Sequence, residues 1–166
     1  MIKVSLPLLA GFLALSLTAC GTAALPTALS PVLMQSGTLQ IAGLDAQLGQ
    51  NLANYAISQN TGGTGYCYQY VAQAIHAHLP GFLSGNHAYL AADQLANSPH
   101  FKEVAISPEQ LSLLPAGAVV VWSQGSSESG HISIADGRGN EVSDHIGPQM
   151  RAHYGGGVAR VFVPVP

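Results

Sequence analysis

The first half of the chain carries apolar residues at helical spacing. Apolar positions three or four residues apart predict a helix over about residues 44–59. A glycine-rich segment at 61–65 interrupts this pattern, and a second helical stripe covers 67–79 before a Pro-Gly pair ends it. A third, shorter helix is expected over 88–96.

The second half changes to short runs of β-branched residues. Each run is bounded by Gly, Ser or Pro, as expected for strands joined by turns. The runs that predict strands cover 101–106, 118–122, 131–135, 140–144 and 158–163. Helices first and strands afterwards predict the α+β class, with the N-terminal helices packed on a small antiparallel sheet.

The N-terminus has the pattern of an export signal. A lysine at position 3 precedes an apolar stretch, 4–16, which is shorter than the roughly 20 residues of a transmembrane helix. The next segment, Leu-Thr-Ala-Cys-Gly at 17–21, resembles the lipobox of bacterial lipoproteins, in which the cysteine is diacylated and becomes the mature N-terminus. The resemblance implies lipidation of Cys20, and an ordinary secretory signal is the alternative.

Three segments follow from this pattern. We expect a signal peptide over 1–19, a lipidated cysteine with a flexible tether over 20–40, and a catalytic domain over 41–166. The protein would then lie in the cell envelope, anchored to a membrane through Cys20. Gly21 after that cysteine favours the outer membrane, on its periplasmic face, if the cell is Gram-negative.

Composition and charge narrow the classes of partner. The 166 residues are 48% hydrophobic and 8% charged, with a net charge of −3, which suits one compact domain. The chain has no run of Lys or Arg, so nucleic acids and other polyanions are disfavoured as partners. We expect a monomer.

Cys67 is the only thiol that the mature chain would keep free. An unpaired cysteine in an exported protein is a liability unless its reactivity is used. Cys67 stands where the glycine-rich segment meets the second helix, and a helix N-terminus favours the thiolate form of a cysteine. A nucleophile is therefore expected, the alternative being a small buried side chain.

A thiol hydrolase also needs an imidazole and a polar group that orients it. His131 opens a predicted strand, and Asp144 ends the next one across the turn at 136–139. These two residues would be neighbours on paired strands, which predicts the catalytic set Cys67, His131 and Asp144. His145 and Ser143 are the competing candidates for the third position.

The other polar and aromatic residues suggest neither a metal nor a cofactor. None of the seven histidines belongs to a tight ligand motif such as His-Glu-x-x-His. Tyr66 and Tyr68 flank the candidate nucleophile and would contact substrate, or else pack in the core or at its rim. We expect no metal and no cofactor.

Four motifs resemble, in order, the CHAP amidase/peptidase domains of the papain-like NlpC/P60 superfamily. They are Gly-Tyr-Cys-Tyr-Gln-Tyr-Val-Ala at 65–72, Gly-Asn at 85–86, Pro-Ala-Gly-Ala-Val-Val-Val-Trp at 115–122, and Gly-His-Ile-Ser-Ile at 130–134. Val142-Ser143-Asp144 then stands where the family has Val-Ser-Glu. The resemblance covers roughly residues 60–163.

The resemblance implies a papain-like fold and an enzyme that cuts an amide bond of peptidoglycan. The family contains N-acetylmuramoyl-L-alanine amidases and stem-peptide endopeptidases, with the residues at positions 67 and 131 as nucleophile and base. The chain departs from the family pattern at Tyr66, at Gln69 and at Asp144, where the family often has Gln, an aromatic residue, and Glu or Asn. The departure at Asp144 affects the residue expected to orient His131.

Other functions fit the same residues. A thioester formed on Cys67 could pass its acyl group to an amine instead of water, which would make the chain an acyltransferase. The fold could also serve a lipoprotein that binds peptidoglycan without cleaving it. An exported toxin with an immunity partner is a further alternative, which the predicted lipid anchor disfavours because it implies work on the producer's own wall.

Overall fold

A computed structural model describes residues 29, 32–35, 38–60, 62–152 and 155–166. The predicted signal peptide and Cys20 lie outside these residues. Helices come first and most of the sheet follows, so the expected α+β class with an antiparallel sheet is confirmed.

The elements follow one another in a simple order. The helical ones are α1 (Ala46–Ser58), α2 (Cys67–His76), η1 (Ala88–Leu90), α3 (Ala91–Ala96) and η2 (Pro108–Leu113). The strands are β1 (Val32–Gln35), β2 (Thr38–Ile41), β3 (Phe101–Val104), β4 (Val119–Trp122), β5 (His131–Ala135), β6 (Asn140–Val142), β7 (Ile146–Pro148) and β8 (Ala159–Pro164).

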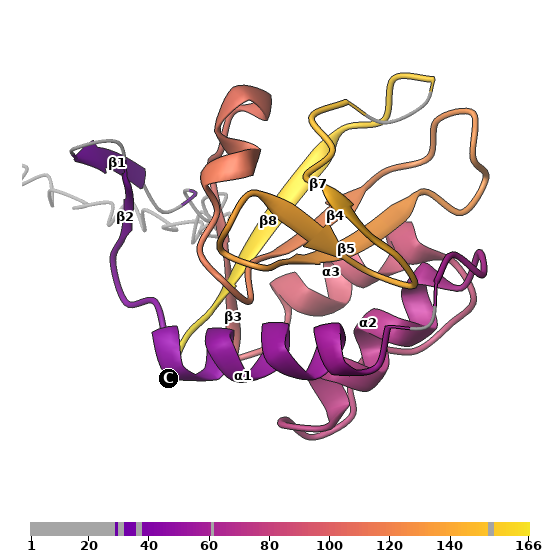
Figure 1. Cartoon of the computed structure of the whole chain (residues 1–166), viewed down its shortest axis with the longest axis horizontal. Helices are drawn as coiled ribbons and strands as arrows, with labels where there is room; N and C mark the ends of the chain where they lie inside the picture. Colours follow the sequence, from indigo (N-terminus) through magenta and orange to yellow (C-terminus); the bar gives the residue numbers. More distant parts are fainter. Residues whose placement is uncertain (1–28, 30–31, 36–37, 61, 153–154) are drawn as a thin grey trace, which may run out of the picture.

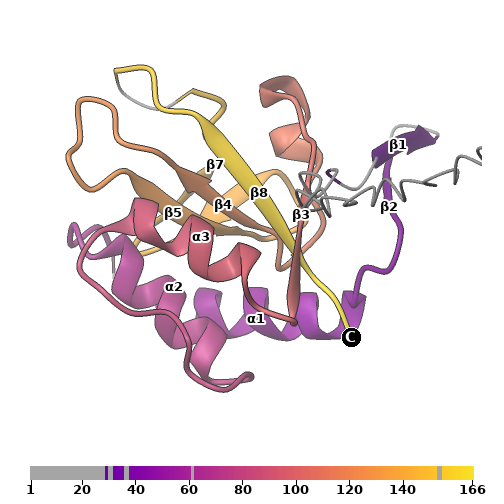
Figure 2. The same ribbon diagram turned by 180° about the vertical axis from the view of Figure 1, so that it is seen from behind.

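The main sheet has six antiparallel strands in the order β3-β8-β4-β5-β6-β7. Helices α1 and α2 run beneath it in Figure 1, and α3 crosses behind it, as the reverse view in Figure 2 shows. All six strands of this sheet come from the second half of the sequence. The three helices pack against the sheet.

Alternation along the strands divides the core into two layers. Val119 and Val121 of β4 face the helices together with Ile132, Ile134 and Phe162. The intervening residues of the same strands, such as Val120 and Trp122, face the opposite side with Val161, Val163 and Leu111 of η2. Both faces of the central strands are buried, which explains why these strands are continuous apolar runs in the sequence.

Helix α1 begins at a side-chain cap. The Asp45 carboxylate accepts a hydrogen bond of 2.9 Å from the backbone N–H of Leu48, as expected of an aspartate at a helix N-cap. The predicted helix over 44–59 matches α1, and the strand predicted at 131–135 matches β5.

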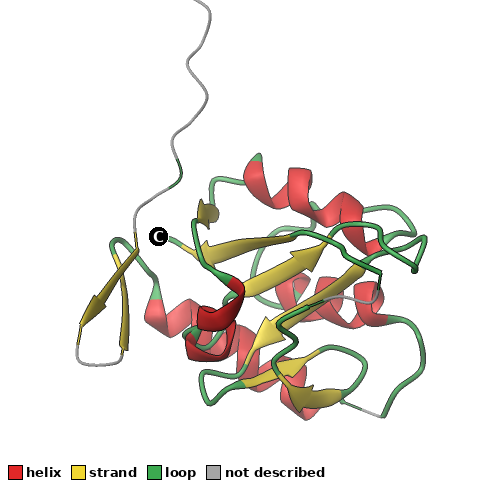
Figure 3. Cartoon of the chain, turned by 90° about the horizontal axis from the view of Figure 1, so that it is seen from above, coloured by secondary structure: helices red, strands yellow, loops and turns green. Residues whose placement is uncertain are grey.

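Two elements differ from the sequence-based prediction. Residues 32–35 and 38–41, all but the last of which were expected within a flexible tether, pair as the antiparallel hairpin β1–β2 at one end of the molecule (Figure 3). Leu39 and Ile41 of this hairpin are buried in the second layer of the core. Strand β7 was not predicted, because residues 146–148 are too few to show a period.

In the part of the chain that the structure describes, every helix lacks either the length or the apolar character needed to traverse a bilayer.

Candidate active site

Cys67 is the first residue of α2 and is half-buried. The N-cap residue, Tyr66, makes no side-chain hydrogen bond to the helix. The first backbone amides of a helix have no carbonyl partner within it and carry partial positive charge, so they favour an anion beside them. Cys67 therefore lies at the end of α2 where these unpartnered amides are found.

His131 is the first residue of β5, and its residue surface is 8% exposed. Gly130 before it has a φ of +65°, and a Cβ atom there would lie 2.3 Å from the carbonyl oxygen of Trp122. Trp122 is also the residue that pairs with His131 between β4 and β5. Glycine is thus required where the chain enters β5, both for its backbone conformation and for this close approach.

Glu141 of β6 is the carboxylate beside the imidazole. Its Oε1 atom lies 3.3 Å from Nε2 of His131, and the residue is 1% exposed. Its Oε2 atom accepts hydrogen bonds from Nε2 of Gln149 (3.0 Å), N of Met150 (3.1 Å) and Oγ of Ser133 (3.4 Å). One oxygen is therefore held by three donors, while the other faces the histidine.

These contacts favour the charged imidazole. Burial acts most strongly on His131 and lowers its pKa, but the hydrogen bonds to the Cys67 side chain and to Glu141, together with their negative charges, outweigh it. The net effect raises the pKa of His131 to about 9. At neutral pH the histidine can thus serve as the positive partner of a thiolate.

Asp144 does not take the place predicted for it. Strand β6 ends at Val142, and the chain reverses through residues 143–145 into β7, with the N–H of Ser143 donating to the carbonyl of His145 at 2.8 Å. Asp144 therefore lies in a tight turn and binds the loop before Cys67, while Glu141 is the carboxylate that faces His131.

The loop before Cys67 is held by this aspartate. Oδ2 of Asp144 accepts hydrogen bonds from the backbone N–H groups of Thr64 (2.7 Å) and Gly65 (2.6 Å). Burial of the carboxylate acts to raise its pKa, but these donors, with His145 and Ser143, outweigh that effect and lower the pKa of Asp144 to about 2.

The two competing candidates lie in the same cluster. Nδ1 of His145 lies 3.4 Å from Oδ1 of Asp144, and its Nε2 lies 3.7 Å from Oε1 of Glu141. The His145 and His131 rings are 5.9 Å apart between centroids. Ser143 donates a 3.2 Å hydrogen bond through Oγ to Asp144, so it acts on the turn.

Glu141 was missed from the sequence, although strand alternation carries a signal for it. Residues 131, 133 and 135 point to the same face of β5, and Ala135 pairs with Glu141 across the turn. A glutamate on that face lies on the same side of the sheet as His131 and Ser133. The signal depends on a register that the sequence does not show directly.

A pocket of about 230 Å³ opens at Cys67. Apart from the cysteine, its lining consists of uncharged residues, among them Gln69, Asn86 and Ser129. The two predicted contact residues differ in exposure. Both line this pocket, but Tyr66 is 61% exposed, whereas Tyr68 is 8% exposed and packs in the helix-facing core.

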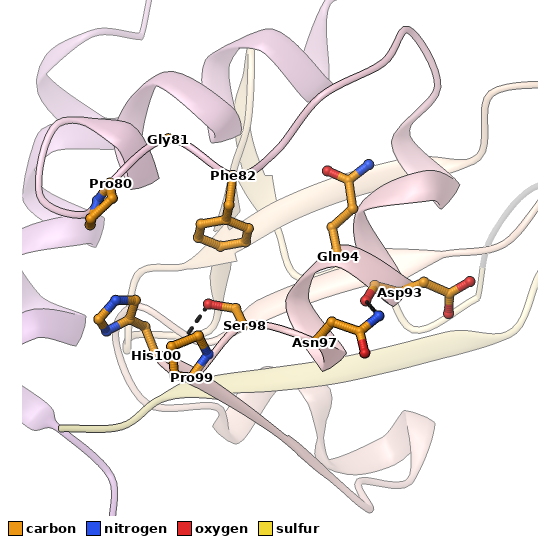
Figure 4. Close-up of a pocket in the computed structure, with 9 residues that line it drawn as sticks. All are labelled: Pro80, Gly81, Phe82, Asp93, Gln94, Asn97, Ser98, Pro99 and His100. Carbon is orange, nitrogen blue, oxygen red and sulfur yellow. Dashed lines mark hydrogen bonds between the residues drawn. The ribbon is translucent and has the colours of Figure 1, made fainter.

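A larger cavity of about 550 Å³ shares no lining residue with the Cys67 pocket (Figure 4). It lies between residues 80–82 and 93–100, and the Asp93 carboxylate in its wall is paired with Arg160 at 2.7 Å. The paired thiol and imidazole, and not cavity size, identify the chemical site. Within the described residues, no group of three or more His, Cys, Asp or Glu is arranged to hold a metal ion.

No protein family and no curated protein matches this chain significantly by sequence. Two solved structures match its fold, both of the type VI effector–immunity complex Tae3–Tai3 from Ralstonia pickettii, one of the native proteins and one with selenomethionine. The fold is papain-like.

The structural match covers more than two thirds of this chain, but the sequence identity is low. The native complex aligns at 24% identity over 69% of this chain and 96% of the matched chain, with a TM-score of 0.54. The selenomethionine complex aligns at 25% identity over 67% and 97%, also with a TM-score of 0.54. The papain-like fold expected from the sequence is therefore confirmed.

Proposed function

We propose that this chain is a cysteine hydrolase that cleaves an amide bond of peptidoglycan, either as an N-acetylmuramoyl-L-alanine amidase or as a stem-peptide endopeptidase. The observation that carries the proposal is the hydrogen-bonded pair of Cys67 and His131, with Glu141 behind the imidazole. The motifs that resemble CHAP domains, and the papain-like fold shared with the Tae3–Tai3 structures, support the substrate class.

In the proposed reaction the Cys67 thiolate attacks the amide carbonyl carbon. The C–N bond breaks as His131 gives its proton to the leaving amine, and a thioester forms. The backbone N–H of Cys67 lies at the start of α2, where a helix amide has no carbonyl partner within the helix, and would donate to the oxyanion. An oxyanion donor of this kind contributes about 3–4 kcal/mol to lowering the barrier.

Water then resolves the thioester. The neutral imidazole left after the first step takes a proton from the water, whose oxygen bonds to the acyl carbon while the C–S bond breaks. The products are a carboxylic acid, which ionises by giving its proton to the released amine or to solvent, and the restored thiolate–imidazolium pair. Glu141 stabilises the charged imidazole at the start and end of this cycle, because its Oε1 faces Nε2.

Digestion of purified sacculi tests the proposal. The full-length chain should release soluble peptide-containing fragments, whereas Cys67→Ala should release none; Cys20→Ser serves as a matched control, since it replaces the other cysteine of the chain. Mass analysis of the fragments identifies the bond that is cut. Equal release by wild type and Cys67→Ala would exclude the thiol mechanism.

A reaction in isotopically labelled water distinguishes hydrolysis from acyl transfer. In water enriched in oxygen-18, a hydrolase places the heavy isotope in the new carboxylate of each product. An acyltransferase given an amine acceptor would instead form a new amide without the isotope. Binding of sacculi without any released fragment would favour a peptidoglycan-binding lipoprotein.

The lipid anchor belongs to the same proposal. We infer from the lipobox-like segment at 17–21 that Cys20 is acylated and holds the domain at a membrane of the cell envelope. Metabolic labelling with a fatty acid should modify the wild-type chain and not Cys20→Ser. Labelling of both chains would place the acyl group elsewhere.

A second candidate function is favoured by the matched structures, which are of an effector–immunity complex. Under this reading, the chain is an exported hydrolase that a separate immunity protein blocks. Periplasmic expression in a host without such a protein distinguishes the two. Lysis by the wild type and not by Cys67→Ala would favour the effector, and normal growth would favour a resident hydrolase.

A further inference from the structure

The turn at residues 143–145 lies against the loop that leads to the nucleophile. Nδ2 of Asn60 donates to the carbonyl of Ser143 at 3.3 Å, and Oγ1 of Thr64 lies 3.2 Å from Oδ2 of Asp144. The N–H groups of Thr64 and Gly65 bind the same carboxylate oxygen at 2.7 Å and 2.6 Å. Four hydrogen bonds thus join two segments that are about eighty positions apart in the sequence.

We propose that Asp144 is a positioning residue, whose carboxylate fixes the backbone at 64–65 and thereby places Cys67 against His131. The proposal rests on the function proposed above, because it assigns Asp144 a role toward the same thiol. It replaces the role predicted from the sequence, in which Asp144 would orient the imidazole.

The composition of the loop explains why hydrogen bonds to Asp144 are needed to hold it in one conformation. Residues 61–65 are Thr-Gly-Gly-Thr-Gly, and Gly62 and Gly65 have φ values of +91° and +80°. Glycine loses more conformational freedom on ordering than any other residue, so a loop with three glycines has a large entropic tendency to move. Hydrogen bonds from two backbone N–H groups to one charged carboxylate oppose that tendency.

The location of Asp144 links its hydrogen bonds to the groups that would react. Asp144 follows Glu141 by three residues, and Glu141 holds His131. The same hairpin, β6–β7, therefore holds the histidine through one carboxylate and the nucleophile loop through another. Displacement of a reacting group by about 1 Å can cost about a hundredfold in rate, so this common support bears directly on reactivity.

Other charged or titratable groups around Asp144 are few. His145 contacts its Oδ1 atom at 3.4 Å, and Ser143 donates to the same oxygen at 3.2 Å. The Oδ2 atom is left for the nucleophile loop alone among the described contacts. The two oxygens of Asp144 thus divide between the turn and the loop.

The experiment measures the reactivity of Cys67 itself, so it does not depend on cleavage of peptidoglycan. The full-length wild type, Asp144→Ala and Asp144→Asn are treated with iodoacetamide between pH 5 and 10, and alkylation of Cys67 is followed by peptide mass spectrometry. In Asp144→Ala we expect alkylation at pH 6–7 to slow about tenfold or more, with a profile moved toward higher pH, since the thiolate loses its fixed place beside His131.

Asp136→Ala is the matched control. Oδ1 of Asp136 accepts hydrogen bonds from the N–H groups of Arg138 (2.7 Å) and Asn140 (2.9 Å), so this residue also ties a turn through two backbone amides. It belongs to the β5–β6 turn, at the other end of β6. A purely structural loss should lower the melting temperature of both alanine variants and leave the alkylation profile unchanged.

Each outcome decides between positioning and structure. Slower alkylation in Asp144→Ala, a smaller effect in Asp144→Asn, which keeps one acceptor oxygen, and no effect in Asp136→Ala support the proposal. Wild-type rates and profiles in both Asp144 variants, or an equal loss in Asp136→Ala, overturn it. If Asp144→Ala does not fold, the comparison of Asp144→Asn with Asp136→Asn decides in the same way. Inactivity of the wild type on sacculi would count against the proposed function and would leave this comparison valid.

Discussion

Oε1 of Glu141 lies 3.3 Å from Nε2 of His131, while the other oxygen of the same carboxylate is bound by three donors. The glutamate is buried, so its charge is poorly screened by water. This relationship supplies the third member of the proposed catalytic set and explains how a buried histidine can stay charged.

Replacement of Glu141 by Gln should strongly reduce activity and move the alkaline limb of the pH profile to lower pH. The variant keeps one acceptor oxygen for Gln149 and Met150 but loses the charge that raises the pKa of His131. Each unit lost from that pKa corresponds to about 1.4 kcal/mol, or tenfold in the imidazolium equilibrium. The measurement is kcat/KM on solubilised peptidoglycan between pH 5 and 10.

The control for this variant is Glu103→Gln. Glu103 is also an ion-paired carboxylate, bound to Arg160 at 2.9 Å and 2.7 Å, but it lies on β3. Its loss should leave the pH profile in place. An unmoved alkaline limb in Glu141→Gln would show that Glu141 does not act on His131.

The titration of His131 should have a midpoint near pH 9 in the wild type. The imidazolium is favoured below this value and is lost as the pH rises through it, because Cys67 and Glu141 stabilise the charged form. Cys67→Ala removes one of these partners and should move the midpoint down. Imidazole proton resonances in NMR spectra, assigned with His131→Ala, measure the shift, and an unchanged midpoint in Cys67→Ala would contradict the pairing.

Asp144 should make the stability of the protein depend on pH in acid. Its pKa falls from 3.8 to about 2 on folding, so its stabilising effect is present above pH 4 and is lost as the pH falls through 2. The shift corresponds to about 2 kcal/mol. Urea unfolding of wild type and Asp144→Asn should differ by this amount at pH 6 and converge near pH 2; a difference that persists at pH 2 would mean that the charge is not its source.

The two tyrosines beside Cys67 should respond differently to truncation. Tyr66→Ala removes an exposed ring at the pocket and should raise KM several-fold without changing stability. Tyr68→Ala removes a ring from the core and should cost about 3–5 kcal/mol, as large aromatic deletions do. Kinetics on peptidoglycan fragments and urea unfolding check the pair. A loss of stability in Tyr66→Ala would place that ring in the core.

Gly130→Ala should disturb the start of β5. A Cβ atom at position 130 would meet the carbonyl oxygen of Trp122 at 2.3 Å, and the φ of +65° is unfavourable for alanine by about 1–2 kcal/mol. We expect a lower melting temperature and a loss of activity, because His131 follows directly. Gly156→Ala is the matched control, since its φ of +89° is similar but its Cβ would meet nothing within 4 Å. Equal losses of activity in both variants would rule out the close approach at Gly130 as the cause.

Local sequence patterns were sufficient to predict most of the secondary structure. Helical spacing predicted α1 and the start of α2 at Cys67, and β-branched runs predicted β4, β5 and β8. These elements are long enough to show a period, and their boundaries carry glycine or proline. The β1–β2 hairpin was missed because its small, uncharged surroundings have the composition of a linker.

The sequence by itself predicted the fold class, which the structure confirms, and the two residues that we propose to react. Cys67 at a helix start and His131 at a strand start are both local features, each set by neighbouring residues in the chain. The carboxylate beside the histidine could not be predicted from such local features. Glu141 and Asp144 are both acidic, close in sequence and near the end of one short strand.

Only the tertiary structure decided between these two carboxylates. The pairing of Ala135 with Glu141 places the glutamate on the face that carries His131, and the reversal at 143–145 turns Asp144 toward a loop some eighty residues earlier in the chain. Strand register and long-range contacts arise from the packing of the whole domain. Because a shift of one residue in register moves every side chain of a strand to the other face, no local pattern could assign these roles.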